Sequence, residues 1–224
     1  METRAQLETR LVERIGQILR DEIEKNGKAS LLVSGGSTPK RLFEKLSKLS
    51  IQWENVTVSL VDDRFVADNH PDQNGTMLKD LLLQQAASKA SFIPLISGND
   101  LGSSLKEASA AIKNIALPYT IIILGVGEDG HTASIFPDSE EMEHAVSVDT
   151  TETLMVTNSR SLPYSRITFT LNALLNSKYI FVHCYGMKKA RIIDVARQQI
   201  GAMPYPIAAF LNQTKTPIEV YWAE

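Results

Sequence analysis

The sequence predicts an α/β protein: one domain, residues 1–224, with a mostly parallel sheet and helices on both faces. Apolar segments rich in β-branched residues alternate along the chain with segments whose apolar residues recur at helical spacing. Such alternation is typical of parallel strands joined by crossover helices. No stretch of the sequence reads as a long linker, an internal repeat or a low-complexity tract. The length also suits one large domain, since a chain of this size buries about 70 to 75% of the surface that it exposes when unfolded.

The first part of the chain predicts a helix, a strand, a turn and a second helix. The first helix has an apolar stripe that faces the core: Leu7, Leu11, Ile15, Ile18, Leu19 and Ile23. It ends near Asn26-Gly27. A strand is expected over residues 29–33 and a glycine-rich turn over residues 34–38. The next helix is expected from Pro39 onward, with Thr38 as its N-cap.

The rest of the chain repeats this alternation. A strand over residues 56–61 precedes a polar loop over 62–75 and a helix over 76–87. A helix over 103–115 then leads into a strand over 120–124. The remaining expected elements are strands over residues 145–148, 154–157, 166–170, 179–184 and 218–222, and a helix over 188–199.

Charge and composition exclude several classes of partner. The chain carries 23 basic and 26 acidic residues, a balance with no general attraction to nucleic acid or acidic membranes. We therefore expect a small-molecule ligand and no obligate protein partner. Acidic residues near the N-terminus argue against a transit peptide, and no apolar run suits a signal peptide or membrane span, so a cytoplasmic location is expected. Cys184 lies in an apolar run, as a buried and inert thiol would.

Three polar segments follow predicted strands, at the edge where open α/β sheets bind ligands. The first is Ser34-Gly35-Gly36-Ser37-Thr38. Its glycines let backbone amides approach an anion, and its hydroxyl groups add hydrogen-bond donors. The segment is therefore a candidate phosphate-binding loop, with a simple capped turn as the alternative.

The second polar segment runs from Asp62-Asp63-Arg64 to Asn74. The Arg64 guanidinium suits a phosphate group, to which it can donate two parallel hydrogen bonds. Asp62 and Asp63 suit a role in orienting that arginine or in binding sugar hydroxyls. The alternative is a local ion pair between aspartate and arginine, which is common on protein surfaces.

The third polar segment, residues 125–134, contains the pattern G-x-G-x-x-G at Gly125, Gly127 and Gly130. A nicotinamide-nucleotide site is nevertheless not expected. That fingerprint requires a full helix after the third glycine, whereas Pro137 and Asp138 interrupt the chain within two turns.

His131, in the same segment, is the side chain best suited to accept and return a proton near neutral pH. A carboxylate from Glu128 or Asp129 is expected to fix its tautomer, and backbone amides of residues 125–130 are candidates to stabilise an oxyanion. The alternative is a histidine that only makes structural hydrogen bonds. That alternative fits the other histidines better: His70, His144 and His183. None has the spacing of a metal site, so no metal or cofactor is expected.

Together, these motifs resemble the 6-phosphogluconolactonase family, within the wider group that includes glucosamine-6-phosphate deaminases. The matching residues span nearly the whole chain: Ser34-Gly35-Gly36-Ser37-Thr38-Pro39, Asp63-Arg64, Asn74, Gly125-Val126-Gly127-Glu128-Asp129-Gly130-His131-Thr132-Ala133-Ser134-Ile135-Phe136-Pro137, Arg166-Ile167-Thr168, Gly186, Lys189-Ala190 and Pro206. The resemblance implies a Rossmann-like fold. It also implies hydrolysis of 6-phospho-D-glucono-1,5-lactone to 6-phosphogluconate in the oxidative pentose phosphate pathway.

The resemblance further implies roles for individual residues. His131 would activate the attacking water, supported by Asp129 or Glu128. The substrate and its phosphate would be held by a larger set: Ser34, Gly35, Gly36, Ser37, Thr38, Asp63, Arg64, Asn74, Arg166 and Lys189. Whether Lys188 takes the place of Lys189 stays open at this point.

The chain departs from the family pattern at two places. Asp62-Asp63-Arg64 stands where the family usually has Asp-Glu-Arg, which shortens one carboxylate side chain. Gln73 stands where the family has a serine before the asparagine. The roles of these two positions are therefore open.

Two rival functions come from the same group. Deaminases that act on glucosamine 6-phosphate carry a glutamate five residues after the histidine, where this chain has Phe136, whose apolar ring cannot transfer protons. Sugar-phosphate sensors in transcriptional regulators carry an attached DNA-binding module, and this chain has neither a separate helix-turn-helix segment nor a basic stripe.

Overall fold

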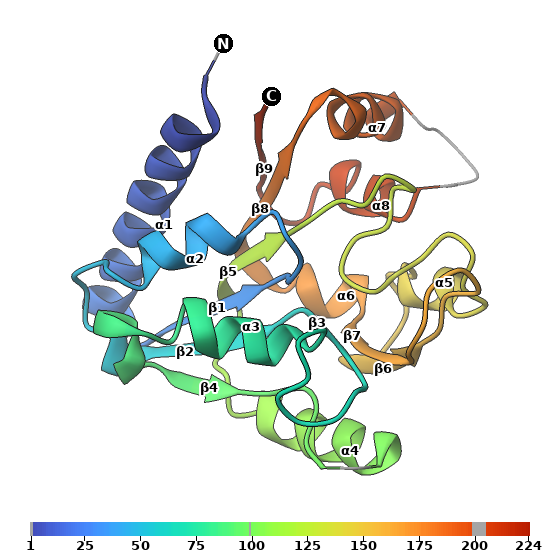
Figure 1. Cartoon of the computed structure of the whole chain (residues 1–224), viewed down its shortest axis with the longest axis horizontal. Coiled ribbons are helices and arrows are strands. Elements are labelled where there is room, and N and C mark those ends of the chain that lie inside the picture. The colour runs from blue at the N-terminus through green and yellow to red at the C-terminus, as the bar shows by residue number, and fades with distance from the viewer. Residues whose placement is uncertain (1, 99, 199–204) are drawn as a thin grey trace.

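A central parallel sheet organises the protein, as the computed structural model of residues 2–98, 100–198 and 205–224 shows (Figure 1). Its six strands lie in the order β4-β2-β1-β5-β8-β9, and every neighbouring pair is parallel. The strands are β1 (Ala29–Val33), β2 (Val56–Leu60), β4 (Ser91–Ile93), β5 (Tyr119–Leu124), β8 (Ser177–Tyr185) and β9 (Ile218–Ala223). The predicted α/β class and mostly parallel sheet are confirmed.

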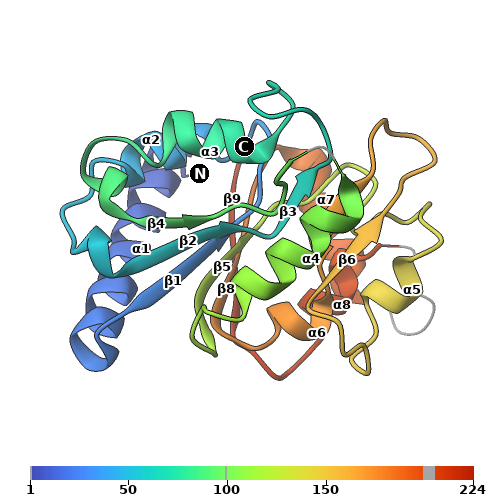
Figure 2. The same ribbon diagram turned by 90° about the horizontal axis from the view of Figure 1, so that it is seen from below.

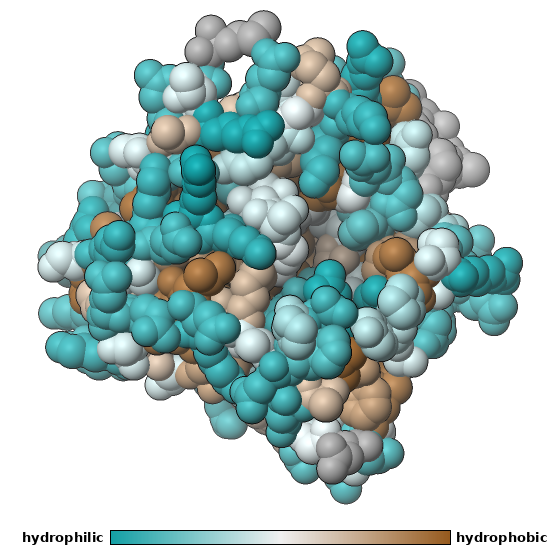
Figure 3. Space-filling view, viewed as in Figure 1, coloured by the Kyte–Doolittle hydropathy of each residue, from teal (hydrophilic) through white to brown (hydrophobic). Residues whose placement is uncertain are grey.

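Helices cover both faces of this sheet, with α2 and α3 on one side and α4 and α6 on the other (Figure 2). The longest helix, α1, packs against α2. The α-helices are α1 (Arg4–Asn26), α2 (Lys40–Leu46), α3 (Asn74–Leu81), α4 (Leu101–Ile112), α5 (Met142–Ala145), α6 (Leu171–Leu174), α7 (Met187–Gln198) and α8 (Ile207–Leu211); η1 (Trp53–Asn55) and η2 (Gln85–Lys89) are short 3₁₀ helices. Hydrophilic residues cover most of the face in Figure 3, and hydrophobic ones form only small separate patches.

Helix α1 illustrates how local signals and burial agree. Thr3 and Gln6 form a capping box at its start, and Gly27, with φ of 74°, ends it in the left-handed conformation. The predicted apolar stripe is buried along its whole length. The two chain ends lie side by side, because Arg4 Nε donates a hydrogen bond of 2.8 Å to the carbonyl oxygen of Glu224 (Figure 1).

A second, antiparallel sheet adjoins the first. Its order is β3 (Asp62–Arg64), β7 (Arg166–Phe169) and β6 (Leu154–Thr157). Val61 joins the two sheets: its N–H donates to Val33 of β1, and its carbonyl accepts from Phe169 of β7. The expectation of a loop at residues 62–64 is therefore wrong. A strand of three residues whose partner lies about a hundred residues later leaves no periodic signal in the local sequence.

Three other expectations are wrong in detail. Helix α2 starts at Lys40 with Pro39 as N-cap and no side-chain cap, so Thr38 does not cap it. The helix expected over residues 76–87 starts earlier and ends at Leu81. Gln85, with φ of 49°, cannot continue a right-handed α-helix, and a short 3₁₀ helix begins there instead.

Residues 145–148 form the end of α5 and a turn instead of the expected strand. Helical hydrogen bonds from Ala145 and Val146 to the carbonyls four residues earlier fix this conformation, and Val148 is 61% exposed. Its β-branched side chain thus packs against no sheet. Helix α7 matches the expected helix as far as Gln198, and residue 199 lies outside the described residues.

A buried polar chain links β8 to α1 and α2. Tyr185 Oη donates to Glu8 Oε1 at 2.8 Å, and Lys45 Nζ lies 3.2 Å from Glu8 Oε2. His183 Nε2 lies 2.9 Å from Tyr185 Oη, whose only proton is already donated, so Nε2 carries a proton and donates it. Nδ1 is then an acceptor without a partner among the described residues. His183 is therefore a neutral, buried imidazole.

The burial of His183 predicts acid sensitivity. Burial lowers its pKa from 6.5 to about 4, an effect that the charge of Glu8 opposes and that of Lys189 reinforces. Below pH 6.5 His183 binds a proton in the unfolded chain, whereas in the folded protein it stays neutral until about pH 4. The free energy of unfolding should fall across this window by up to about 3 kcal/mol on account of this one group.

Denaturant unfolding at pH 7, 6, 5 and 4 tests this expectation. His183→Gln should have a shallower pH slope than the wild type. Equal slopes for His183→Gln and the wild type would contradict the assignment.

Candidate active site

The three polar segments meet in one cavity of about 200 Å³ at the carboxyl ends of β1 and β5. Ligands of open α/β sheets bind at this edge, next to the point where the strand order reverses. Among the described residues, the lining comprises Ser34, Gly35, Gly36, Ser37, Thr38, Asp62, Arg64, Asn74, Gly125, Val126, Gly127, His131, Ala133 and Lys189. Most of the residues selected from the sequence are therefore brought together.

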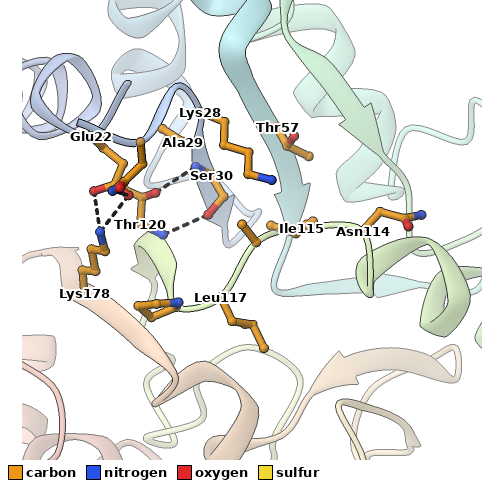
Figure 4. Close-up of a pocket in the computed structure, with 13 residues that line it drawn as sticks. Glu22, Lys28, Ala29, Ser30, Thr57, Asn114, Ile115, Leu117, Thr120 and Lys178 are labelled. Carbon is orange, nitrogen blue, oxygen red and sulfur yellow. Dashed lines mark hydrogen bonds and ion pairs between the residues drawn. The ribbon is translucent and has the colours of Figure 1, made fainter. Parts of the chain in front are cut away.

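A larger cavity of about 430 Å³ lies at the amino ends of β1 and β5 (Figure 4). Its buried polar groups bond to one another. Lys178 Nζ contacts both carboxylate oxygens of Glu22, at 2.7 and 2.6 Å, and Ser30 and Thr120 exchange hydroxyl–amide hydrogen bonds (Figure 4). Because these groups satisfy each other, the smaller cavity is the better candidate for chemistry.

The loop after β1 is held close to Asn74. A Cβ atom on Gly35 would lie 2.0 Å from Asn74 Oδ1, so no side chain fits there. Asn74 Nδ2 in turn donates to the carbonyl of Asp62 at 3.0 Å. Ser34 Oγ accepts the N–H of Gly125 at 3.2 Å, which ties this loop to the one after β5. These contacts hold together three segments that line the cavity: the loop after β1, the start of α3 and the loop after β5.

Strand β3 divides its three residues between two sides, because successive side chains of a strand point in opposite directions. Asp62 and Arg64 line the cavity, whereas Asp63 lies behind it. Asp63 accepts hydrogen bonds from the backbone N–H groups of Arg64, Asn74 and Gly75 at 2.8, 2.7 and 3.0 Å. Burial raises the pKa of Asp63 to about 7 although these bonds oppose the rise. The contacts of Asp63 are those of a structural residue that fixes the start of α3.

Asp62 lines the cavity, as its candidate role beside Arg64 suggested, although the residues implied by the family resemblance do not include it. Its carboxylate is buried, and Oδ2 accepts the Ser134 hydroxyl at 2.6 Å. Burial raises its pKa, against the Ser134 hydrogen bond and the nearby charges of Arg64, His131 and Arg166. Strand alternation is the signal that identifies Asp62, and it becomes visible only once residues 62–64 are known to be a strand.

Positive charge gathers beside Asp62. Arg64 and Arg166 are directly paired across β3 and β7, although like charges in that position repel. Arg64 Nη1 donates to the carbonyl of Asp72 at 2.7 Å, and Arg166 Nη1 donates to that of Tyr164 at 2.6 Å. Burial and the charge of Arg64 lower the pKa of Arg166, which is 4% exposed and lies outside the lining.

The open choice between two lysines has a structural answer. Lys189 lines the cavity, whereas the Lys188 ammonium lies 3.5 Å from Glu128 Oε2 on the exposed surface. Lys189 and Arg64 thus bring two cationic side chains into the lining, and Arg166 adds a third positive charge beside Arg64. A phosphate dianion is the chemical group that such an arrangement suits.

His131 also lines the cavity, with a carboxylate fixed to one ring nitrogen. Its Nδ1 lies 2.6 Å from Asp129 Oδ1, which also accepts the His131 N–H at 3.2 Å. Partial burial raises the pKa of Asp129, but the hydrogen bond and charge of His131 outweigh it, so the net shift is downward. Nε2 has no hydrogen-bond partner among the described residues. The supporting carboxylate is therefore Asp129, and Glu128 points to Lys188 instead.

The loop that carries His131 folds tightly. A Cβ atom on Gly127 would lie 2.1 Å from His131 Nδ1, so the Gly127 backbone is flush with the imidazole. The N–H groups of Gly125, Gly127 and Gly130 donate to Ser34 Oγ and to the carbonyls of His131 and Gly127. These three amides are thus already engaged, contrary to the expected oxyanion role. A turn follows Gly130, where the dinucleotide fingerprint requires a helix.

Residues 2–98, 100–198 and 205–224 hold no group of three or more histidine, cysteine, aspartate or glutamate side chains that could bind a metal ion. Their helices include none both long and apolar enough to cross a membrane. The Cys184 thiol is buried, which raises its pKa to about 11.

Comparisons with known proteins agree with one another. Residues 2–222 match the family model described as glucosamine-6-phosphate isomerases/6-phosphogluconolactonase. Relatives named 6-phosphogluconolactonase from Rhizobium meliloti (strain 1021) and Helicobacter pylori (strain J99) are each 34% identical over 214 residues, which cover 95% and 96% of this chain and 92% of each relative. The crystal structure of a 6-phosphogluconolactonase from Shewanella baltica OS155 has a TM-score of 0.95 and 36% identity, covering 100% of this chain and 96% of that one.

The contact of Gly35 with Asn74 predicts a sharp loss of stability in Gly35→Ala. The added methyl group would force Asn74 from its hydrogen bond to Asp62, at a cost of about 1 to 3 kcal/mol. Gly102→Ala, in α4 where the nearest atom is 3.5 Å away, should be neutral or stabilising by up to about 1 kcal/mol. Urea unfolding of both variants measures the difference. Equal stabilities of the two variants would show that the loop accommodates a methyl group at position 35, contrary to the structure.

Proposed function

The chain belongs to the glucosamine-6-phosphate isomerase/6-phosphogluconolactonase family, and from that premise we propose that it is a 6-phosphogluconolactonase. The reaction is hydrolysis of 6-phospho-D-glucono-1,5-lactone to 6-phosphogluconate, a step of the oxidative pentose phosphate pathway. The observation that carries the proposal is the Asp129–His131 pair, which shares one cavity with Arg64 and Lys189. A proton acceptor and cationic side chains in one cavity suit a substrate that carries both a reactive carbonyl and a phosphate.

Phe136 favours the lactonase over the isomerising deaminase of the same family. Its ring is buried beside His131, at the position where the deaminases carry a glutamate. Ring opening and movement of a carbon-bound proton need an acid–base group there, and a phenyl ring supplies none. Lactone hydrolysis needs only one base and one water molecule.

In the proposed complex, the phosphate binds at the cationic end of the cavity. Arg64 and Lys189 contact it directly, and the hydroxyls of Ser37 and Thr38 and the amides of the glycine pair donate to its oxygens. Arg166 adds positive charge from its buried position next to Arg64. A dianion there relieves the repulsion between the two arginines. Asp62, with one carboxylate oxygen held by Ser134, is placed to accept a hydrogen bond from a sugar hydroxyl.

The proposed chemistry uses His131 as a general base. Nε2 removes a proton from water while the water oxygen bonds to the lactone carbonyl carbon, and the carbonyl oxygen becomes an oxyanion. The bond from that carbon to the ring oxygen then breaks as the imidazolium returns the proton to the leaving oxygen. Asp129 stabilises the imidazolium through Nδ1. Such acid–base catalysis contributes about 10²- to 10⁴-fold to the rate.

We assign this activity to the whole chain as one domain, residues 1–224, in the cytoplasm. The site takes Asp62 and Arg64 from the three-stranded sheet and its loops from the six-stranded one, so neither sheet suffices alone. One buried thiol without a disulfide suits a reducing compartment. Water is the only co-reactant that the chemistry needs.

The role of His131 is tested by proton release in a pH-stat with freshly generated lactone, corrected for spontaneous hydrolysis. The wild type should accelerate hydrolysis. His131→Ala should lower kcat by at least about 100-fold and change KM much less, because the phosphate contacts remain. A His131→Ala variant with full activity would exclude the histidine as base. No acceleration by the wild type would refute the lactonase proposal, and glucosamine 6-phosphate would be the next substrate to assay.

The phosphate site is tested by Arg64→Ala in the same assay. Loss of a charge-assisted contact that persists from ground state to transition state should raise KM by about 10- to 100-fold at nearly constant kcat. Arg160→Ala is the matched control, because the Arg160 guanidinium pairs with the exposed Glu140 and, among the described residues, is not part of the cavity lining. An unchanged KM in Arg64→Ala would place the phosphate elsewhere.

A further inference from the structure

A tight turn places Phe136 directly beside His131. Thr132 and Ile135 form a short antiparallel bridge, closed by the hydrogen bond from Ile135 N–H to the Thr132 carbonyl. Ala133 adopts φ of 49° to make this reversal. The residues that flank the bridge therefore face each other, and the ring centroids of His131 and Phe136 lie 4.8 Å apart at an angle of 50°.

Phe136 also contacts the buried arginine. The guanidinium carbon of Arg166 lies over its ring, 4.9 Å from the centroid, and the Tyr164 carbonyl holds that guanidinium in place. Phe136 is 2% exposed, yet it is absent from the contiguous apolar core that the other buried phenylalanines join. Its ring is therefore packed against a histidine and an arginine of the site, which is an unusual use of an apolar side chain.

The hydrogen bond to Asp129 fixes only one atom of the His131 ring. A single bond at Nδ1 leaves the plane of the imidazole free to tilt, and a tilt would move Nε2 on the far side of the ring. The Gly127 backbone and the Phe136 ring are the groups that fix this plane.

We propose that Phe136 is a positioning residue for the reaction: backed by Arg166, its ring holds the His131 imidazole so that Nε2 faces the cavity. This inference rests on the proposed lactonase activity for its kinetic readout. Phe136 would act through His131 alone and touch neither the lactone nor its phosphate. Its loss should therefore reduce the chemical step and leave substrate binding intact.

Phe136→Leu is the direct test, measured in the pH-stat assay. It should lower kcat by about 10- to 100-fold, the effect of a misplaced catalytic group, with KM within about twofold of the wild type. Phe136→Met, which fills the space with a flexible chain, should lose the same activity and replaces the leucine variant if that one fails to fold. Phe136→Tyr, which keeps the ring, should retain most of the activity. Phe181→Leu is the matched control, because this buried ring packs in the apolar core, beside the rings of Tyr179 and Tyr221, and does not line the cavity.

The ¹⁵N NMR signals of the His131 imidazole give a readout independent of activity, assigned by their loss in His131→Gln. The wild type, Phe136→Tyr and Phe181→Leu should show one well-defined ring environment, and Phe136→Leu and Phe136→Met an averaged one. Wild-type kcat in both ring-less variants, or a joint change of kcat and KM with unaltered His131 signals, would overturn the inference. If the wild type lacks lactonase activity, the proposed function fails, and the NMR comparison alone decides whether Phe136 orders His131.

Discussion

The parallel pairing of β1 with both β2 and β5 is the constraint on which the site depends. The chain leaves β1 for a neighbour on one side and later returns, through β5, to the other side. The loops that follow these strands therefore diverge from one point and leave room between them. An order that placed another strand between β1 and β5 would separate the glycine-rich loop from the loop that carries His131.

The small antiparallel sheet completes what the parallel sheet begins. Val61 bonds to both sheets, so the direction of β3 is fixed relative to β1, and with it the side to which Asp62 and Arg64 point. The same sheet pairs Arg64 with Arg166 and buries the second of these cations. A protein tolerates such a pair when function requires it, because burial of like charges is unfavourable for folding alone. The proposed phosphate would offset the repulsion within this arginine pair.

The sequence allowed the parallel sheet, helix α1 and most of the cavity lining to be predicted, because periodic apolar patterns and loop residues after strands are local signals. It did not reveal β3, because the partner strand of β3 is distant along the chain. It also wrongly indicated a strand at residues 145–148, which form the end of α5 and a turn. Adjacent candidates were equally beyond it. Asp129 and Glu128 are neighbours in the sequence, and so are Lys189 and Lys188. Only the backbone geometry decides which acid bonds to His131 and which lysine lines the cavity.

The turn at Ala133 limits how this protein can evolve. A buried left-handed residue that also lines the cavity can be replaced by glycine without backbone strain, but a β-branched residue there would be strongly disfavoured. The backbone of Gly127 imposes a second limit a few residues earlier. Sequence drift in this loop is thus restricted by conformational energy before any selection on catalysis acts, and variation is expected to accumulate in the surrounding surface instead.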